Sequence, residues 1–203
     1  MNKAVLFFAY AFASFLTTSS FADDLLLKFD IDEPLKVKIH HDIVKNTGLH
    51  KTEHDNYHLT VAIVKDVDSR DMEALSTFLK KALKKMCPND VEIELKDFGC
   101  YDVGAHRKER HHQPIVAYPD SESYKDLKAL NKHLSEHMQT FKSPSEKKYT
   151  FFDETMPGTY KPHITIANTK YINDKKADRT DVIAKLTRNL EKCKPYKFML
   201  HFK

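Results

Sequence analysis

Cysteine is scarce in this chain of 203 residues, and neither sign of charge dominates it. The three cysteines, at positions 87, 100 and 193, form no CxxC pair and no cysteine/histidine finger spacing, which excludes a disulfide scaffold and a zinc finger. Three thiols leave room for one disulfide, for which Cys87 and Cys100 are one option. The net charge of +4, with 31% charged side chains, is too mild for a protein that coats nucleic acid, so any nucleotide site must be local.

The apolar run near the start of the chain, residues 4–16, is too short to indicate a membrane span. It follows the basic Lys3 and precedes small residues at Ser20 and Ala22, a pattern typical of a signal peptide cleaved after Ala22. An uncleaved anchor is the alternative, and no cysteine follows the run to carry a lipid. We therefore expect residues 1–22 to be removed. Residues 23–203 should form a single bilobal domain that is secreted or periplasmic and free of the membrane.

Two segments about a hundred residues apart share one sequence pattern, in which a histidine and a threonine alternate with apolar residues. They read YHLTVAIV from position 57 and YKPHITIA from position 160. The apolar and β-branched residues predict two strands, and alternation along a strand places His58 with Thr60 on one face and His163 with Thr165 on one face. If the strands lie side by side, two imidazoles and two hydroxyls line one cleft. That arrangement is suited to holding a phosphate between an acid and a base.

The tripeptide H-x-[ST] also occurs at His50 and at His133, so it carries little information alone. The copy at His50 lies in a polar stretch. The copy at His133 lies in a helical pattern, where residues two apart do not share a face. A plain alternative for the pair at His58 and His163 is that they are the solvent-facing side chains of two amphipathic strands. Their repetition in matching strand-then-helix settings favours a shared function.

The order of elements predicts an α+β protein of two similar lobes, each a small, mainly antiparallel sheet backed by helices, with a central cleft between them. Predicted strands cover residues 25–29, 35–39, 57–64, 91–95, 98–101, 114–118, 160–167 and 197–202. Predicted helices cover residues 68–86, 121–141 and 176–193, because their apolar positions recur at helical spacing. The polar segment 40–56 is predicted to be a loop that contains one helical turn, and the polar segment 142–159 is a predicted loop.

Aromatic and basic residues near the motifs are secondary candidates. Strand parity turns Tyr57 and Tyr160 away from the motif histidines, which favours a role in the core. Lys161 shares the face of His163 if the strand begins that early, and is a candidate for substrate binding. Tyr118 and Phe152 are candidates for stacking on a base, although core packing is the default for an aromatic residue.

The densest cationic run, HRKERHH, covers residues 106–112. A solvated surface loop is the default interpretation of such a run. The functional alternative is a phosphate-binding flap in which Arg107 and Arg110 contact the substrate. Metal binding by His106, His111 and His112 is a weaker alternative, because neither the spacing nor a cysteine partner matches a structural zinc site.

The motifs His58-Leu-Thr60 and His163-Ile-Thr165, the latter within PHITIA, resemble those of the 2H phosphoesterases. That family includes plant-type cyclic phosphodiesterases, bacterial proteins named 2′,5′ RNA ligases, and an RNA-trimming exonuclease. The resemblance covers the order of elements from about Leu25 onward and matches no residue outside the motifs. It implies a phosphoric diester hydrolase of nucleotide or RNA ends that needs no cofactor. The signal peptide and the histidine-rich loop depart from the familiar cytosolic members.

The chemistry follows from the residues as well. Opening a 2′,3′-cyclic phosphate requires a base to deprotonate water and an acid to protonate the departing ribose oxygen, and one neutral and one protonated histidine supply both near neutral pH. The hydroxyls of Thr60 and Thr165 would donate hydrogen bonds to the non-bridging oxygens. Either histidine could be the acid.

Two other classes remain open. A secreted ribonuclease with a histidine pair would cleave internal RNA bonds and form cyclic phosphates from intact RNA. An exported, histidine-rich metal-binding protein would carry metal and would have no role for Thr60 or Thr165. The oligomeric state is not readable from the sequence.

Overall fold

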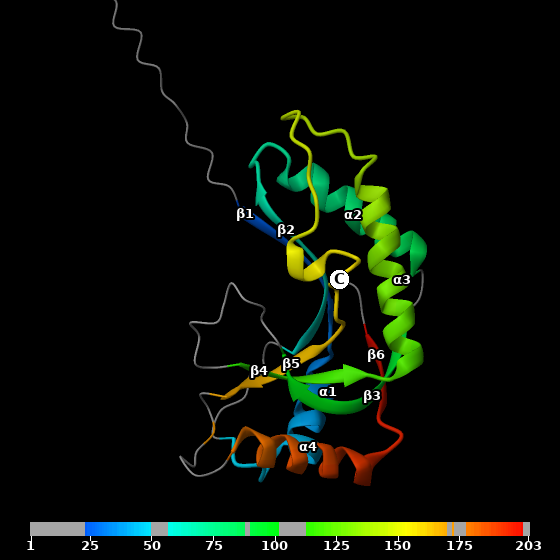
Figure 1. Ribbon diagram of the computed structural model, residues 1–203. Helices are drawn as coiled ribbons and strands as arrows, with labels where there is room; N and C mark the ends of the chain where they lie inside the picture. Colours follow the sequence, from blue (N-terminus) through cyan, green and yellow to red (C-terminus); the bar gives the residue numbers. More distant parts are fainter. Residues whose placement is uncertain are drawn as a thin grey trace, which may run out of the picture.

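The computed structural model describes residues 23–49, 57–87, 90–101, 113–169, 172 and 178–200 (Figure 1). In this part the chain combines strands and helices into an α+β protein, which confirms the predicted fold class. None of the described helices is both long enough and apolar enough to cross a membrane.

A six-stranded antiparallel sheet forms the centre of the described part, in the order β1-β2-β5-β4-β3-β6. The strands are β1 (Asp23–Asp30), β2 (His58–Val67), β3 (Val91–Cys100), β4 (Pro114–Pro119), β5 (Ile164–Asn168) and β6 (Lys197–Leu200). A long pairing of β1 with β2 makes one half, and the other four strands make the second half. The halves join where Leu59 of β2 pairs with Ile164 of β5. This arrangement is consistent with the two lobes that the sequence predicts.

Helices flank the two halves of the sheet. They are α1 (Glu33–Ile39), α2 (Met72–Met86), α3 (Ser121–Met138) and α4 (Arg179–Cys193). Helices α2 and α3 pack against each other, and α4 packs against β3 and the short π-helix η1 (His40–Val44) (Figure 1). Each long helix buries one apolar stripe, which in α4 consists of Val182, Leu186 and Leu190. The three long predicted helices are therefore confirmed.

Aspartates fix where two of these helices begin. The Asp120 carboxylate accepts hydrogen bonds from the backbone N–H groups of Glu122 and Ser123, and Asp178 accepts one from Thr180. These bonds satisfy backbone donors that the first turn of a helix leaves without partners. The cap at Asp120 matters most for the site, because it ends β4 and turns the chain directly into α3.

The strand predicted at residues 35–39 is wrong, since this segment is the helix α1. Leu35 and Ile39 are spaced by four residues, and that spacing fits a helix as well as a strand. Residues 32–34 form the start of this helix. Asp32 is the N-cap, and Pro34 stands in the first turn, where its fixed φ is favourable and its missing N–H costs nothing.

The three cysteines are all unbonded, so the optional Cys87–Cys100 disulfide is not formed. Cys87 follows the last turn of α2, and Cys100 ends β3. Burial raises the pKa of both thiols. They behave as partly buried apolar side chains rather than as cross-links.

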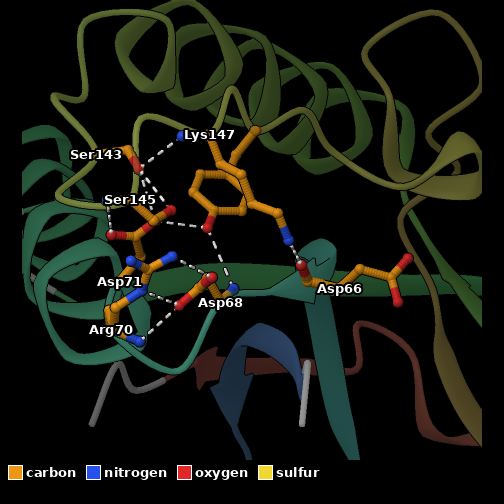
Figure 2. A network of polar contacts seen from close by, with 8 residues as sticks. Asp66, Asp68, Arg70, Asp71, Ser143, Ser145 and Lys147 are labelled. Carbon is orange, nitrogen blue, oxygen red and sulfur yellow. Dashed lines mark hydrogen bonds and ion pairs between the residues drawn. The ribbon is translucent and has the colours of Figure 1, made fainter. Parts of the chain in front are cut away.

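The predicted loop at residues 142–159 is tied to the rest of the fold. Tyr149 and Phe151 are buried in the core. Ser143, Ser145 and Tyr149 all donate hydrogen bonds to the carboxylate of Asp71, at the start of α2 (Figure 2). The loop therefore has a fixed course on its way to β5.

Candidate active site

The pairing of β2 with β5 brings the two His-x-Thr motifs together. Leu59 and Ile164 lie opposite each other and are 0% and 1% exposed. Opposed residues in an antiparallel pair share a face, and the next residue along each strand points to the other face. The side chains on that other face, which we call the motif face, are His58, Thr60, His163 and Thr165. All four are half-buried, whereas their apolar neighbours are buried.

Tyr57 and Tyr160 belong to the core, as their strand parity predicts. They are 1% and 3% exposed. The Tyr160 hydroxyl donates a hydrogen bond of 2.7 Å to the backbone carbonyl of Thr60. Tyr160 therefore links the chain that leads into one motif to the strand that carries the other.

The ring of His163 is held from two sides. Its Nδ1 lies 2.7 Å from the carbonyl oxygen of Lys161. A carbonyl only accepts, so Nδ1 carries the proton and the neutral ring has its lone pair on Nε2. The ring of Tyr101, which follows β3, packs on the imidazole with a centroid distance of 4.2 Å. The contact of Tyr101 with His163 could not be predicted from the sequence, because no sequence pattern connects Tyr101 to β5.

Burial lowers the pKa of His163 below its ordinary value. The bond to the Lys161 carbonyl opposes this shift, because it favours the protonated ring, and a positive charge on His58 reinforces it. The last effect requires the two imidazoles to be near each other. The environment of His163 thus favours its neutral form at a pH where an ordinary histidine would be partly charged.

Strand β1 adds charged residues beside the first motif. Asp30 is the partner of His58 across β1 and β2, and Lys28 is the partner of Thr60. The side chains of Lys28 and Asp30 form an ion pair of 3.0 Å, and both are partly exposed. Cross-strand partners share a face, so this pair lies on the edge of the motif face. Sequence reasoning missed both residues, since the register of β1 against β2 is not readable from the chain.

Tyr118 adjoins the motif face on the side of β4. Ala117 pairs with Ile164, so the next residue along β4, Tyr118, comes beside His163 in the register. Its side chain is half-buried. Burial raises the pKa of its phenol, and the charge of Asp97 raises it further. Its position is thus compatible with the predicted contact to substrate.

The other predicted contacts divide between described and undescribed residues. The side chain of Lys161 is exposed, and its backbone carbonyl holds His163. Arg107 and Arg110 lie outside the described residues, as do His106, His111 and His112. Within the described ranges, no three histidine, cysteine, aspartate or glutamate side chains lie close enough together to hold a metal ion.

The other two copies of the H-x-[ST] tripeptide, at His50 and His133, add no described side chain to the motif face. His133 is exposed on α3, as its helical pattern predicts, and His50 lies outside the described residues. A hollow of about 490 Å³ elsewhere on the molecule is lined by residues of α2 and α3 that include Phe78, Lys81 and His137. It is therefore separate from the motif face.

No protein-family model matches the sequence, and no curated protein matches it. Among solved structures, the chain is similar to a crystal structure of a phosphoesterase, with a TM-score of 0.46 and 16% identity, covering 77% of this chain and 78% of the other. It is also similar to the structure of Kluyveromyces marxianus Usb1, with a TM-score of 0.47 and 12% identity, covering 90% of this chain and 92% of the other. At this level of similarity neither structure assigns a function.

Proposed function

We propose that this protein is a metal-independent phosphodiesterase that hydrolyses 2′,3′-cyclic phosphate or 2′,5′-linked ends of nucleotides or RNA. One observation carries the proposal. The pairing of Leu59 with Ile164 places the side chains of both His-x-Thr motifs on the same face of the sheet. Two histidines and two hydroxyls at one place are the groups that phosphodiester hydrolysis requires.

In this proposal His163 is the general base. Its Nδ1–H is donated to the carbonyl of Lys161, so the Nε2 lone pair is left to accept a proton from water. Burial lowers its pKa and favours the neutral, basic form. The water oxygen forms a bond to phosphorus while the bond from phosphorus to one ribose oxygen breaks, and the product is a phosphate monoester.

His58 is then the general acid, which gives its proton to the departing ribose oxygen. Asp30, its partner across β1 and β2, is a carboxylate suited to holding a protonated imidazole in place. Thr60 and Thr165 donate hydrogen bonds to the non-bridging phosphate oxygens, whose charge grows in the transition state. Lys28 adds a cation beside Thr60. Arg107 and Arg110 remain candidates for further contacts to the phosphate.

The test is hydrolysis of 2′,3′-cyclic nucleotides by the purified protein, with and without EDTA. We expect activity that the chelator does not change. Replacing His58 or His163 with alanine should lower the rate by about a hundredfold to ten-thousandfold. His133→Ala is the matched control, because it removes an exposed histidine of α3. Activity that survives both motif substitutions, or that disappears with EDTA, would contradict the proposal. Formation of cyclic ends from intact RNA would favour the ribonuclease alternative.

We also propose that the chain is exported through residues 1–22, which lie outside the described part. Cleavage after Ala22 would keep all the described residues of β1, from Asp23 to Asp30, in the mature chain. The mass of the protein recovered from the secreted or periplasmic fraction tests this. A mature chain that begins at Asp23 is the expected result, and a protein that retains residues 1–22 contradicts it.

A further inference from the structure

A hollow of about 460 Å³ lies where β3 and β4 meet the start of α3. The side chains that line it include Lys96, Asp97, Tyr118, Ser121, Tyr124 and Lys125. Its volume falls within the range of about 300 to 1,000 Å³ that small-molecule sites occupy. The hollow has room for a group of the size of a nucleobase, and it contains two aromatic rings to receive one.

The hollow opens beside the motif face. Asp97 and Tyr118 are paired across β3 and β4, and Tyr118 follows Ala117, whose partner on β5 is Ile164. Alternation therefore puts Tyr118 on the motif face beside His163. The distance from β5 to β3 is two strand spacings, about 10 Å. A phosphate at His163 and a base in the hollow can thus belong to one nucleotide, with the sugar between them.

Tyr118 packs against the backbone of β3. A Cβ atom added at Gly99 would lie 3.1 Å from Cε2 of Tyr118, which is closer than side chains ordinarily pack. Glycine at this position therefore lets the ring rest against the strand. Tyr118 is half-buried and also lines the hollow. A ring held against a sheet in this way is a platform on which a base can stack.

The polar groups around the ring match the edge and the charge of a nucleotide. Asp97 is an exposed carboxylate, which accepts hydrogen bonds from amino groups such as N4 of cytosine. Lys96 and Lys125 are exposed cations that line the hollow, and they can attract the phosphate of a neighbouring nucleotide. An aliphatic ligand would leave these charged groups without a role.

We propose that this hollow binds the nucleobase of the substrate, stacked on Tyr118, and that Asp97 favours bases with an amino group over uracil. The inference rests on the proposed function, because the base is placed by the phosphate that the two histidines hold. Base preference is set on β3 and β4, while the histidines and threonines on β2 and β5 act on the phosphate alone.

The first experiment compares a cyclic nucleotide with a cyclic phosphate that has no base. The substrates are 2′,3′-cyclic CMP and glycerol 1,2-cyclic phosphate. Stacking of one base should give the nucleotide an advantage of about 5- to 150-fold in kcat/KM. Equal turnover of both substrates overturns the base site and leaves the proposed function standing. Turnover of neither overturns the proposed function, and the inference falls with it.

Substitutions in the hollow test whether its aromatic rings cause the preference for the cyclic nucleotide. Tyr118→Leu should reduce the ratio of the two kcat/KM values toward one, whereas Tyr118→Phe, which keeps the ring, should preserve it. If Tyr118→Leu does not fold, Tyr124→Leu tests the second ring that lines the hollow. Lys81→Ala, in the separate hollow of α2, is the control and should keep the wild-type ratio. A ratio that Tyr118→Leu leaves unchanged, or that Tyr124→Leu leaves unchanged where Tyr118→Leu does not fold, rules out this location.

The second experiment concerns the identity of the base. Wild-type protein should prefer 2′,3′-cyclic CMP to 2′,3′-cyclic UMP by at least about 5-fold, the lower end of what a paired base edge supplies. Asp97→Asn should reduce this preference, because an amide offers a donor as well as an acceptor. An equal or greater preference in Asp97→Asn shows that another group reads the base and contradicts the role of Asp97.

Discussion

The carboxylate of Asp71 is the point at which loop 142–159 is fastened to the start of α2, and its removal should be one of the more damaging single changes in the fold. Asp71 is 0% exposed. It accepts hydrogen bonds of 2.6 Å from the Ser143 hydroxyl, 2.6 Å from the Tyr149 hydroxyl and 3.0 Å from the Ser145 backbone N–H, with a further short one from the Ser145 hydroxyl (Figure 2). Substitution by alanine removes the acceptor for all of them.

The expected loss of unfolding free energy depends on which of these donors can form a hydrogen bond to water instead. The hydroxyls of Ser143 and Ser145 are half-buried and can turn toward solvent. The hydroxyl of the buried Tyr149 and the backbone N–H of Ser145 have less freedom. A hydrogen bond to a charged group contributes about 1.5 to 3 kcal/mol net, so two such bonds give about 3 to 6 kcal/mol. That is a large part of the 5 to 15 kcal/mol or so by which domains are stable.

Urea unfolding of wild type, Asp71→Ala and Asp71→Asn measures this cost as a change in midpoint at constant slope. Asp71→Asn should recover part of the loss, because one amide oxygen still accepts. Arg70→Ala is the control and should cost far less, since the Arg70 side chain, which pairs with Asp68, is 67% exposed. A loss below about 1 kcal/mol in Asp71→Ala would refute the assignment of Asp71 as a buried anchor.

Three further predictions concern pH and the junction of the two motifs. Burial alone would raise the pKa of Asp71, but the hydrogen bonds from its neighbours outweigh it and lower that pKa, and Arg70 lowers the pKa of Asp68 to about 2. Because an unfolded aspartate takes up a proton near pH 4, the protein should become easier to unfold as pH falls from about 4 toward 2. Urea unfolding followed by circular dichroism across that pH range measures the change, and constant stability there contradicts the prediction. If His163 is the base, the acid limb of kcat/KM should have its midpoint below 6.5, because the pKa of this histidine is lowered; a midpoint above 6.5 would argue against that role. Tyr160→Phe should cost about 1 to 3 kcal/mol in urea unfolding, since it leaves a β2 carbonyl without its donor, and a neutral effect would show that water replaces the phenol.

The sequence predicts the long elements well because their burial is periodic. Leu75, Leu79 and Leu83 recur on one face of α2, and nothing else in that stretch competes with a helix. The segment at residues 33–39 fails for the opposite reason. Leu35 and Ile39 are four residues apart, a spacing that fits both a helix and a strand, so only the capping position of Asp32 and the early Pro34 distinguish the two.

The motif face could be predicted in part for a similar reason. Parity along each strand fixes that His58 shares a face with Thr60 and His163 with Thr165, whatever the rest of the fold does. Parity does not fix which strands are neighbours. Asp30 reaches the site through the register of β1, and Tyr101 through its position after β3, so neither has a local signature. Residues that reach the motif face only through tertiary contacts cannot be predicted from a single sequence.

The place of the motifs in the sheet has a physical consequence for the site. Beyond the pair of Leu59 with Ile164, β2 no longer has β5 as its neighbour, and its backbone groups must find other partners. The carbonyl of Thr60 accepts from the Tyr160 hydroxyl, and those of Val61 and Ile63 accept from Asn131 Nδ2 and from the N–H of Phe152. These bonds give three carbonyls of β2 partners in the stretch where β5 no longer pairs with it. The motif histidines therefore lie where the two halves of the sheet separate, next to backbone that hydrogen bonds hold in place on both strands.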